Sequence, residues 1–223
     1  MHSKTIKKNF SQKNKLIHNK YLKMEGYDFD GTLFKTNKLH IMSWNKALKY
    51  MHINLNIINL PNICGSNYLK IAHDIHKHLI SHNIGSEISK EKFVESLCEA
   101  KARFILEATT KDIIIITKTI NIILSKKTNA KIIISNNRFD FIIHCLKKKR
   151  LLKYFSYLIC QDYAYCVKTR EKIGTTGKIK PEIEAYCKAS DYFKLPQIQI
   201  YYGNDETDQN FANRLKCKFV LID

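Results

Sequence analysis

Short apolar segments alternate with helical patterns through the second half of this chain. Candidate strands lie at residues 131–135, 157–160, 198–202 and 219–222, and candidate helices lie between them at 139–149, 181–193 and 208–215. Strands that are apolar throughout, each followed by a helix, are typical of a parallel sheet that helices cover. We therefore predict an α/β fold with a Rossmann-like parallel sheet. Residues 113–116 could be a strand or part of a buried helix, and the longer apolar stretch to 127 favours a helix.

The first half of the chain has a different pattern of apolar residues, one that predicts helices. Apolar residues recur at helical spacing over 38–52, 67–82 and 89–109, and no convincing strand interrupts them. Residues 1–22 are polar, basic and weakly periodic, so we expect a flexible leader, with a targeting peptide or a tether to an anionic surface as alternatives. The predicted domains are thus the leader at 1–22, an α/β core at 23–37 and 113–223, and an inserted all-helical cap at 38–112.

Two carboxylates stand where the first predicted strand ends, in the sequence DFDGTL. In an open α/β sheet, ligands bind beyond the carboxyl ends of the strands. Because alternate residues share a face, Asp28 and Asp30 would both point into that crevice, and Gly31 would allow a sharp turn. One carboxylate could attack phosphorus covalently, and the other could serve as general acid and base.

The segment DFDGTL resembles the signature that opens proteins of the haloacid dehalogenase superfamily, and the resemblance runs from about Met24 to the C-terminus. It implies a HAD-like fold with Asp28 as nucleophile and Asp30 as general acid and base. Gly31 and Thr32 would bind the substrate's phosphoryl group. Members that cleave carbon–halogen bonds lack the second acidic residue, so Asp30 indicates phosphoryl transfer.

Two further segments resemble later motifs of the same family. Ser135 closes an apolar run, and the resemblance implies that its hydroxyl binds a phosphoryl oxygen. Asn136, the next residue, is a candidate substrate-binding residue. The sequence GKIKPE resembles the family's Gly-Lys-Pro-x-Pro motif. Counting back from Pro181 gives Lys178 as the motif lysine, and Lys180 is the alternative.

The sequence YGNDETD resembles the family's acidic fourth motif, and the resemblance implies a Mg²⁺ cofactor. Mg²⁺ prefers oxygen ligands and often takes one or two carboxylates. In strict register Asn204 fills the first acidic position and Asp208 the last. A slip of one residue would bring Asp205 to the ion, and this is the register we favour. The predicted metal residues are therefore Asp28, Asp30, Asp205 and Asp208.

The predicted cap opens with LHIMSWNKAL, which resembles the branch containing β-phosphoglucomutase and phosphoglycolate phosphatase-like enzymes. His40 lies twelve residues after Asp28, as in the mutase, and is a candidate substrate-binding residue. A structural role for His40 and Trp44 at the cap hinge is equally compatible with the pattern. Lys101 and Arg103 could face the substrate, although charged residues on a helix are usually solvated.

The charge and the cysteines limit the possible partners and the compartment. The net charge is +18, but Lys, Asn and Ile are all abundant, which indicates a compositional bias of the source genome. We therefore expect no specific nucleic-acid ligand, and we assign the basic run at 147–150 to the end of a helix, where cations are favourable. Seven scattered cysteines and the lack of a signal peptide indicate a cytoplasmic protein.

These features lead to three functional hypotheses. The first is a Mg²⁺-dependent phosphatase that acts on a small phosphorylated metabolite through an aspartyl-phosphate. The second is a sugar phosphomutase, which returns the phosphate instead of releasing it. The third is a catalytically weak protein that binds anionic partners. Oligomeric state is not encoded in any motif of the chain.

Overall fold

The computed structural model of the chain describes residues 23–53, 68–82, 89–126, 130–175 and 179–223. These residues form one seven-stranded sheet in the order β7-β6-β5-β4-β1-β8-β9. The strands are β1 (Met24–Tyr27), β4 (Ala130–Ile134), β5 (Tyr157–Ile159), β6 (Tyr163–Cys166), β7 (Lys172–Gly174), β8 (Ile198–Gly203) and β9 (Lys218–Leu221). β1 lies between β4 and β8 and pairs with both in parallel, and β4–β5 and β8–β9 are parallel as well.

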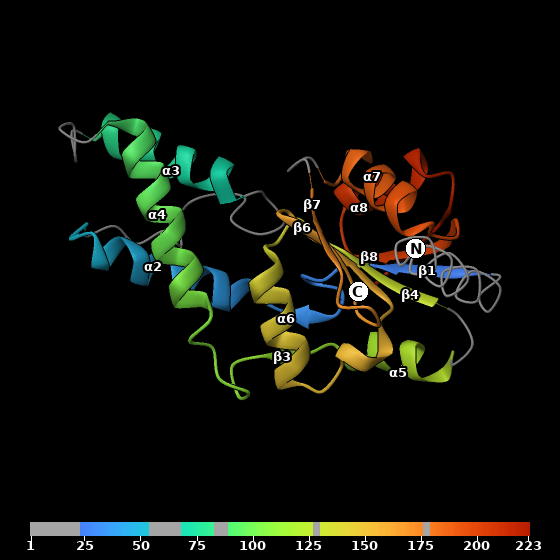
Figure 1. Cartoon of the computed structure of the whole chain (residues 1–223). Helices are drawn as coiled ribbons and strands as arrows, with labels where there is room; N and C mark the ends of the chain where they lie inside the picture. The colour runs from blue at the N-terminus through green and yellow to red at the C-terminus, as the bar shows by residue number, and fades with distance from the viewer. Residues whose placement is uncertain (1–22, 54–67, 83–88, 127–129, 176–178) are drawn as a thin grey trace, which may run out of the picture.

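Helices cover both faces of this sheet (Figure 1). They are α5 (Thr117–Ser125), α6 (Phe139–Lys148), the short 3₁₀ helix η2 (Leu152–Tyr154), α7 (Glu184–Phe193) and α8 (Glu206–Arg214). One hydrophobic cluster joins the sheet to α5 and α6, and a second joins it to α7 and α8. The prediction of a Rossmann-like α/β fold is confirmed.

A separate group of three helices extends from one side of the sheet, at the left of Figure 1. They are α2 (Asn37–Tyr50), α3 (Tyr68–Ser81) and α4 (Lys90–Ile105). Their buried residues, with Trp44, Ile75 and Leu97 at the centre, form a hydrophobic cluster of their own. None of the helices in the described part of the chain is long and apolar enough to cross a membrane.

The structure corrects three details of the sequence-based expectation. Residues 114–115 are not helical but form the short strand β3 (Ile114–Ile115), because they pair antiparallel with β2 (Phe34–Lys35) where the chain enters and leaves the helical group. Helix α7 begins at Glu184 and not at Pro181, because Ile179 and Lys180 are buried and residues 180–181 form a turn before the helix. The sheet also carries two unanticipated antiparallel strands, β6 and β7.

The central strand β1 contains a glutamate and a glycine where an apolar run is usual. Glu25 is buried, but its carboxylate accepts hydrogen bonds from Lys126 Nζ at 2.9 Å and from the Tyr27 hydroxyl at 2.8 Å. A Cβ at Gly26 would lie 2.5 Å from the ring of Tyr201, so only glycine lets β8 approach at this point. Both departures are therefore accommodated by local contacts, and the strand remains intact.

Because β1, β4 and β8 run parallel and adjacent, their carboxyl ends meet at one edge of the sheet. Asp28, Ser135 and Asn204 are the first residues after these three strands. Segments that are more than 170 positions apart in the sequence thus meet at a single edge.

Candidate active site

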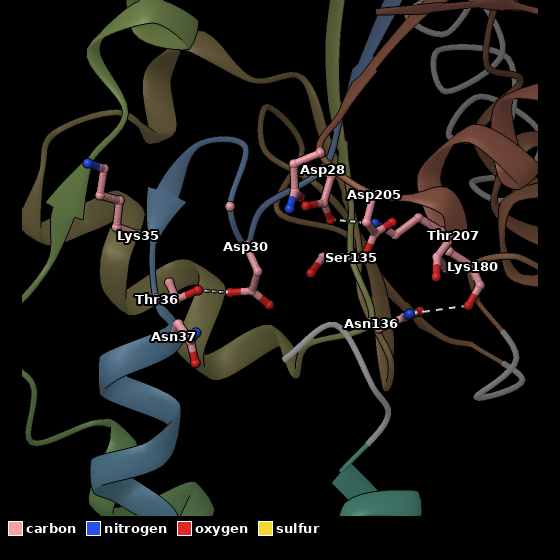
Figure 2. A pocket seen from close by; sticks show the side chains of 12 residues that line it. Asp28, Asp30, Lys35, Thr36, Asn37, Ser135, Asn136, Lys180, Asp205 and Thr207 are labelled. Atoms are coloured by element: carbon pink, nitrogen blue, oxygen red, sulfur yellow. Dashed lines mark hydrogen bonds and ion pairs between the residues drawn. The ribbon is translucent and has the colours of Figure 1, made fainter. Parts of the chain in front are cut away.

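A buried lysine lies between two buried carboxylates at this edge. Lys180 Nζ contacts Asp28 Oδ1 and lies 2.5 Å from Asp208 Oδ1. All three side chains are at most 9% exposed. Asp28 is held by the sheet itself, since its backbone N–H donates to the carbonyl of Tyr202 at 2.8 Å. Figure 2 shows Asp28 and Lys180 pointing toward one another across the pocket.

Two carboxylates share one ammonium group in this cluster, so its charges do not balance. Burial, and then the charge of Asp208, raise the pKa of Asp28 well above its usual range, although Lys180 opposes this. Burial also raises the pKa of Asp208. For Lys180, burial alone would lower the pKa, but the two carboxylates raise it well above the ordinary lysine value. We therefore treat Lys180 as permanently charged.

The second carboxylate of the D-x-D segment has a different environment. Asp30 accepts hydrogen bonds from the Thr36 hydroxyl and the Asn137 amide, and it lies 3.2 Å from His40 Nε2. Burial alone would raise the pKa of Asp30, but His40, Thr36 and Lys101 together lower it. Two carboxylates two residues apart thus have pKa values shifted in opposite directions.

A buried lysine from α4 stands behind His40. Lys101 is fully buried, lies 3.1 Å from His40 Nδ1 and lies 3.1 Å from the centre of the Tyr68 ring. An ammonium group can only donate, so Nδ1 of His40 accepts and the proton of the neutral ring is on Nε2, directed at Asp30. Burial, and then Lys101, lower the pKa of His40, which agrees with a neutral ring. The chain Lys101–His40–Asp30 therefore links the helical group to the site.

The loop after β8 packs against the turn after Asp30. Gly31 has φ 71°, and a Cβ there would lie 2.5 Å from the amide nitrogen of Asn204. Asn204 Oδ1 accepts a hydrogen bond from the Thr32 hydroxyl at 3.2 Å, and its backbone N–H donates to Asp208 Oδ2 at 2.9 Å. Asp205 Oδ1 accepts from the backbone N–H of Asp208 at 2.9 Å and caps the N-terminus of α8.

The loop after β4 supplies the polar wall opposite. Ser135 is buried, and its hydroxyl accepts from the backbone N–H of Asn137 at 3.2 Å. The amide of Asn136 donates to the carbonyl oxygen of Lys180 at 3.1 Å (Figure 2). This loop therefore contacts both the lysine segment and, through Asn137, the carboxylate of Asp30.

These groups line a cavity of about 380 Å³. Its walls include Asp28, Asp30, Gly31, Lys35, Thr36, Asn37, Ser135, Asn136, Lys180, Asn204, Asp205 and Thr207. The volume suits a small ligand, and the lysine beside the carboxylates suits an anionic one.

The donor set of this cavity is compatible with Mg²⁺. Its candidate ligands are all oxygen atoms, from Asp28, Asp30, Asn204 and Asp205. Mg²⁺ prefers oxygen ligands, which usually include water and substrate phosphate. Within the described ranges, no three acidic, histidine or cysteine side chains come close enough together to hold an ion by themselves. A bound ion would therefore depend on water or on substrate for part of its coordination.

Most of the residues singled out in the sequence meet at this site. The cavity is lined by six of them, Asp28, Asp30, Gly31, Ser135, Asn136 and Asp205. Its walls are contacted by three more, Thr32, His40 and Asp208. Lys178 lies outside the described residues, and the lysine found between the carboxylates is the alternative, Lys180.

Other contacts were not anticipated from the sequence. Thr36 and Asn137 both donate to Asp30. The only sequence signal for Asn137 was its place just beyond a strand end. Lys101 is buried, against the usual expectation for a charged helical residue, whereas Arg103 stacks on the ring of Tyr50 at 4.4 Å.

Comparisons with known proteins identify the family of the chain and relatives of its fold. The sequence model of the haloacid dehalogenase-like hydrolase family matches residues 27–222. No curated protein shows significant sequence similarity to the chain.

Several solved structures share the fold. One is a HAD-superfamily hydrolase of subfamily IA from Geobacter sulfurreducens, with 18% identity, TM-score 0.57, and coverage of 89% of this chain and 86% of the other. Another is a protein from Lactobacillus plantarum, provisionally assigned as a phosphoglycolate phosphatase. It has 14% identity and a TM-score of 0.62, and the match covers 90% of this chain and 86% of the other. A third is YfnB from Bacillus subtilis, provisionally assigned as a HAD-hydrolase and solved with bound magnesium. It has 14% identity and a TM-score of 0.56, and the match covers 92% of this chain and 87% of the other.

Proposed function

The chain belongs to the family of haloacid dehalogenase-like hydrolases, and we propose that it is a Mg²⁺-dependent phosphatase that hydrolyses a phosphomonoester of a small metabolite. The observation that carries the proposal is the buried contact of Lys180 with Asp28 and Asp208, beside Asp30 in the same cavity. A nucleophilic carboxylate, a fixed cation and a second carboxylate are the groups that phosphoryl transfer through a covalent intermediate requires.

In the first half-reaction, Asp28 Oδ attacks phosphorus and the bond from phosphorus to the leaving oxygen breaks. Burial keeps water away from the Asp28 carboxylate, and Lys180 holds a positive charge against it as the phosphoryl group arrives. Ser135, Gly31 and Asn136 line the cavity around the same point and would bind phosphoryl oxygens. Asp208 holds Lys180 in place from the far side.

Asp30 would transfer the protons in both half-reactions. An incoming phosphate raises the pKa of a nearby carboxyl group, so the arriving substrate favours a protonated Asp30 that can protonate the leaving oxygen. After the alcohol leaves, the lowered pKa of Asp30 returns it to the ionised form, which can accept a proton from the water that attacks the aspartyl-phosphate. His40 and Lys101 would hold Asp30 in position during both steps.

Mg²⁺ would be held by Asp28, Asp30 and either Asp205 or Asn204, together with water or substrate oxygens, and it would neutralise charge on the phosphoryl group. Asp205 caps α8 through one oxygen, which leaves its other carboxylate oxygen for an ion. Asn204 lies nearest to the D-x-D turn and offers only an amide oxygen. Which of the two residues completes the site is tested below.

We also propose that α2, α3 and α4 act as a cap that restricts substrates to small metabolites. The group has its own hydrophobic cluster and joins the sheet near β2 and β3. It contacts the site through the Lys101–His40–Asp30 chain and through Asn37, the first residue of α2, which lines the cavity. A cytosolic location remains the expectation from the sequence.

The decisive experiment is a screen of phosphorylated metabolites with Mg²⁺, in which released phosphate is measured for wild type and for Asp28→Asn. We expect release by the wild-type protein, a phosphoenzyme that can be trapped, and no turnover in the variant. Turnover that survives Asp28→Asn would refute the mechanism. If sugar phosphates are isomerised and phosphate is not released, the enzyme is a mutase, which the position of His40 would also suit.

A further inference from the structure

A second cavity, of about 670 Å³, lies at the end of α6 and is rimmed by cations. Its cationic lining residues are Lys147, Arg150, Lys153 and Arg170, and its remaining lining residues are Leu146, Leu152, Tyr165 and Val167. We call this cavity the basic groove. Its four cations come from α6 and the residue after its C-cap, from η2 and from the β6–β7 turn, and all four side chains are exposed.

The basic groove lies away from the candidate active site. Helix α6 starts just after the loop that carries Ser135 and Asn136, and it packs back along the sheet toward the starts of the strands. Arg170 lies in the turn after β6, near the start of β5, because Tyr157 of β5 pairs with Cys166 of β6. No lining residue is shared between the two cavities. A ligand in the groove would therefore leave the catalytic cavity open.

Positive charge in the groove is not neutralised by the described parts of the protein. No carboxylate lines the cavity, and none of its four cations forms an ion pair among the described residues. Glu171, next to Arg170 in the chain, instead accepts a hydrogen bond from the Tyr192 hydroxyl at 2.6 Å. Clustered cations without counter-charges attract anionic ligands.

The positions of the arginines indicate that the positive charge of the groove does not simply reflect the lysine-rich composition of the chain. The chain has 33 lysines but only five arginines. Three of the five have partners, since Arg138 lies 3.9 Å from Asp162, Arg214 lies 2.6 Å from Glu182, and Arg103 stacks on Tyr50. The other two, Arg150 and Arg170, both line the basic groove. The guanidinium fork matches a phosphate group in a way that an ammonium group cannot.

Aromatic rings accompany the cations. Tyr165 lines the groove, and Tyr154 on η2 is 36% exposed with the ammonium group of Lys153 5.2 Å from its ring centre. Tyr154 is not a lining residue itself, but it is next to the lining residue Lys153 in the chain. A cationic groove combined with exposed aromatic rings is the arrangement that binds single-stranded nucleic acid, through its backbone phosphates and stacked bases. We propose that the basic groove binds single-stranded nucleic acid without sequence preference, a function beyond and independent of the proposed phosphatase activity.

The test is fluorescence anisotropy of a labelled oligouridine of about twelve nucleotides, titrated with the full chain at several salt concentrations. The test variant is Arg150→Gln with Arg170→Gln. The control is Lys70→Gln with Lys77→Gln, which removes the same charge from exposed positions on α3. We expect about a tenfold or greater loss of affinity in the test variant and less than about twofold in the control. The salt slope should fall by about 1.4, because each phosphate contact on a single strand contributes about 0.7.

A third variant separates stacking from charge. Tyr154→Ala should weaken binding about fivefold or more with an unchanged salt slope, since stacking releases no counterions. Equal losses in the two charge variants would overturn the proposal, because the net charge of +18 would then explain the binding. Binding to vesicles with about 30% anionic lipid but not to the oligonucleotide would also overturn it. Phosphatase activity should be unchanged in all three variants, so failure here does not bear on the catalytic proposal.

Discussion

Asp28 and Asp30 should respond in opposite ways to the same substitution. Asp28→Asn removes one of two buried carboxylates that share Lys180, and we expect the variant to be more stable than wild type. Asp30→Asn removes the negative charge and one of the two acceptor oxygens that serve the Thr36 hydroxyl, the His40 ring and the Asn137 amide, and we expect it to be less stable. The two changes are isosteric and two residues apart, so each controls for the other.

The magnitudes follow from the contacts. Losing hydrogen bonds to a charged acceptor costs about 1.5–3 kcal/mol, so Asp30→Asn should lower the unfolding temperature by about 3–12 °C in a chain of this length. Removing an imperfectly compensated buried charge should stabilise by about 1–3 kcal/mol, so Asp28→Asn should raise the unfolding temperature by a few degrees. Active-site residues often reduce stability in this way.

The pH dependence gives each effect a sign. The pKa of Asp28 is raised in the folded state, so wild type loses stability as pH rises toward that pKa, and the advantage of Asp28→Asn should be present at pH 7 and absent near pH 3. The pKa of Asp30 is lowered, so its contribution is present above the ordinary aspartate pKa and is lost as pH falls through the folded value.

Thermal unfolding followed by circular dichroism, in EDTA so that no metal contributes, measures both variants. A fall in unfolding temperature of about 2 °C or more for Asp28→Asn at pH 7 would refute the reasoning, because it would show that Lys180 stabilises Asp28 by more than burial and Asp208 destabilise it.

Three further predictions concern the metal, the cap and the leader. We predict that Asp205 is the Mg²⁺ ligand, so Asp205→Ala should weaken Mg²⁺ binding steeply in calorimetry. If Asn204 fills the acidic position instead, Asn204→Asp should tighten Mg²⁺ binding, and such a gain in affinity would contradict the prediction. Lys101→Met should lower kcat by about tenfold with little change in KM, because His40 loses the contact that fixes its proton and acid–base catalysis is worth about 10²–10⁴-fold; an unchanged kcat would exclude the relay. Deleting residues 1–22 should leave activity near wild type, and loss of folded protein would show that the leader packs on the core.

The D-x-D segment and the strand pattern carried most of the predictable information. The β-branched run at 131–135 and the apolar segments at 157–160 and 198–202 predicted the strands, because strands buried on both faces have little choice of residue. The ends of those strands then located Asp28, Ser135 and the loop at 203–208, since parallel strands place their carboxyl ends at one edge. Fold class and the edge used for the site therefore followed from local patterns.

Local patterns failed where a residue's role depends on a distant partner. The register of the GKIKPE segment could not be settled by counting, and it is the burial of Lys180 between Asp28 and Asp208 that gives this residue its position. The β6–β7 hairpin was missed because only three residues separate the short YAYC segment of β6 from the end of β5, and because β7 has three residues, KIG, of which one is apolar.

The sequence by itself determined the alternation of the parallel strands with helices, the two carboxylates after β1 and the family resemblance, because these depend on residues adjacent in the chain. Only the tertiary structure decided what surrounds each carboxylate. Asp28 faces Lys180 from 152 positions away, and Asp30 faces Asn137 from 107 positions away. The opposite pKa shifts of two neighbouring aspartates therefore arise from burial and distant charges, which no local pattern records.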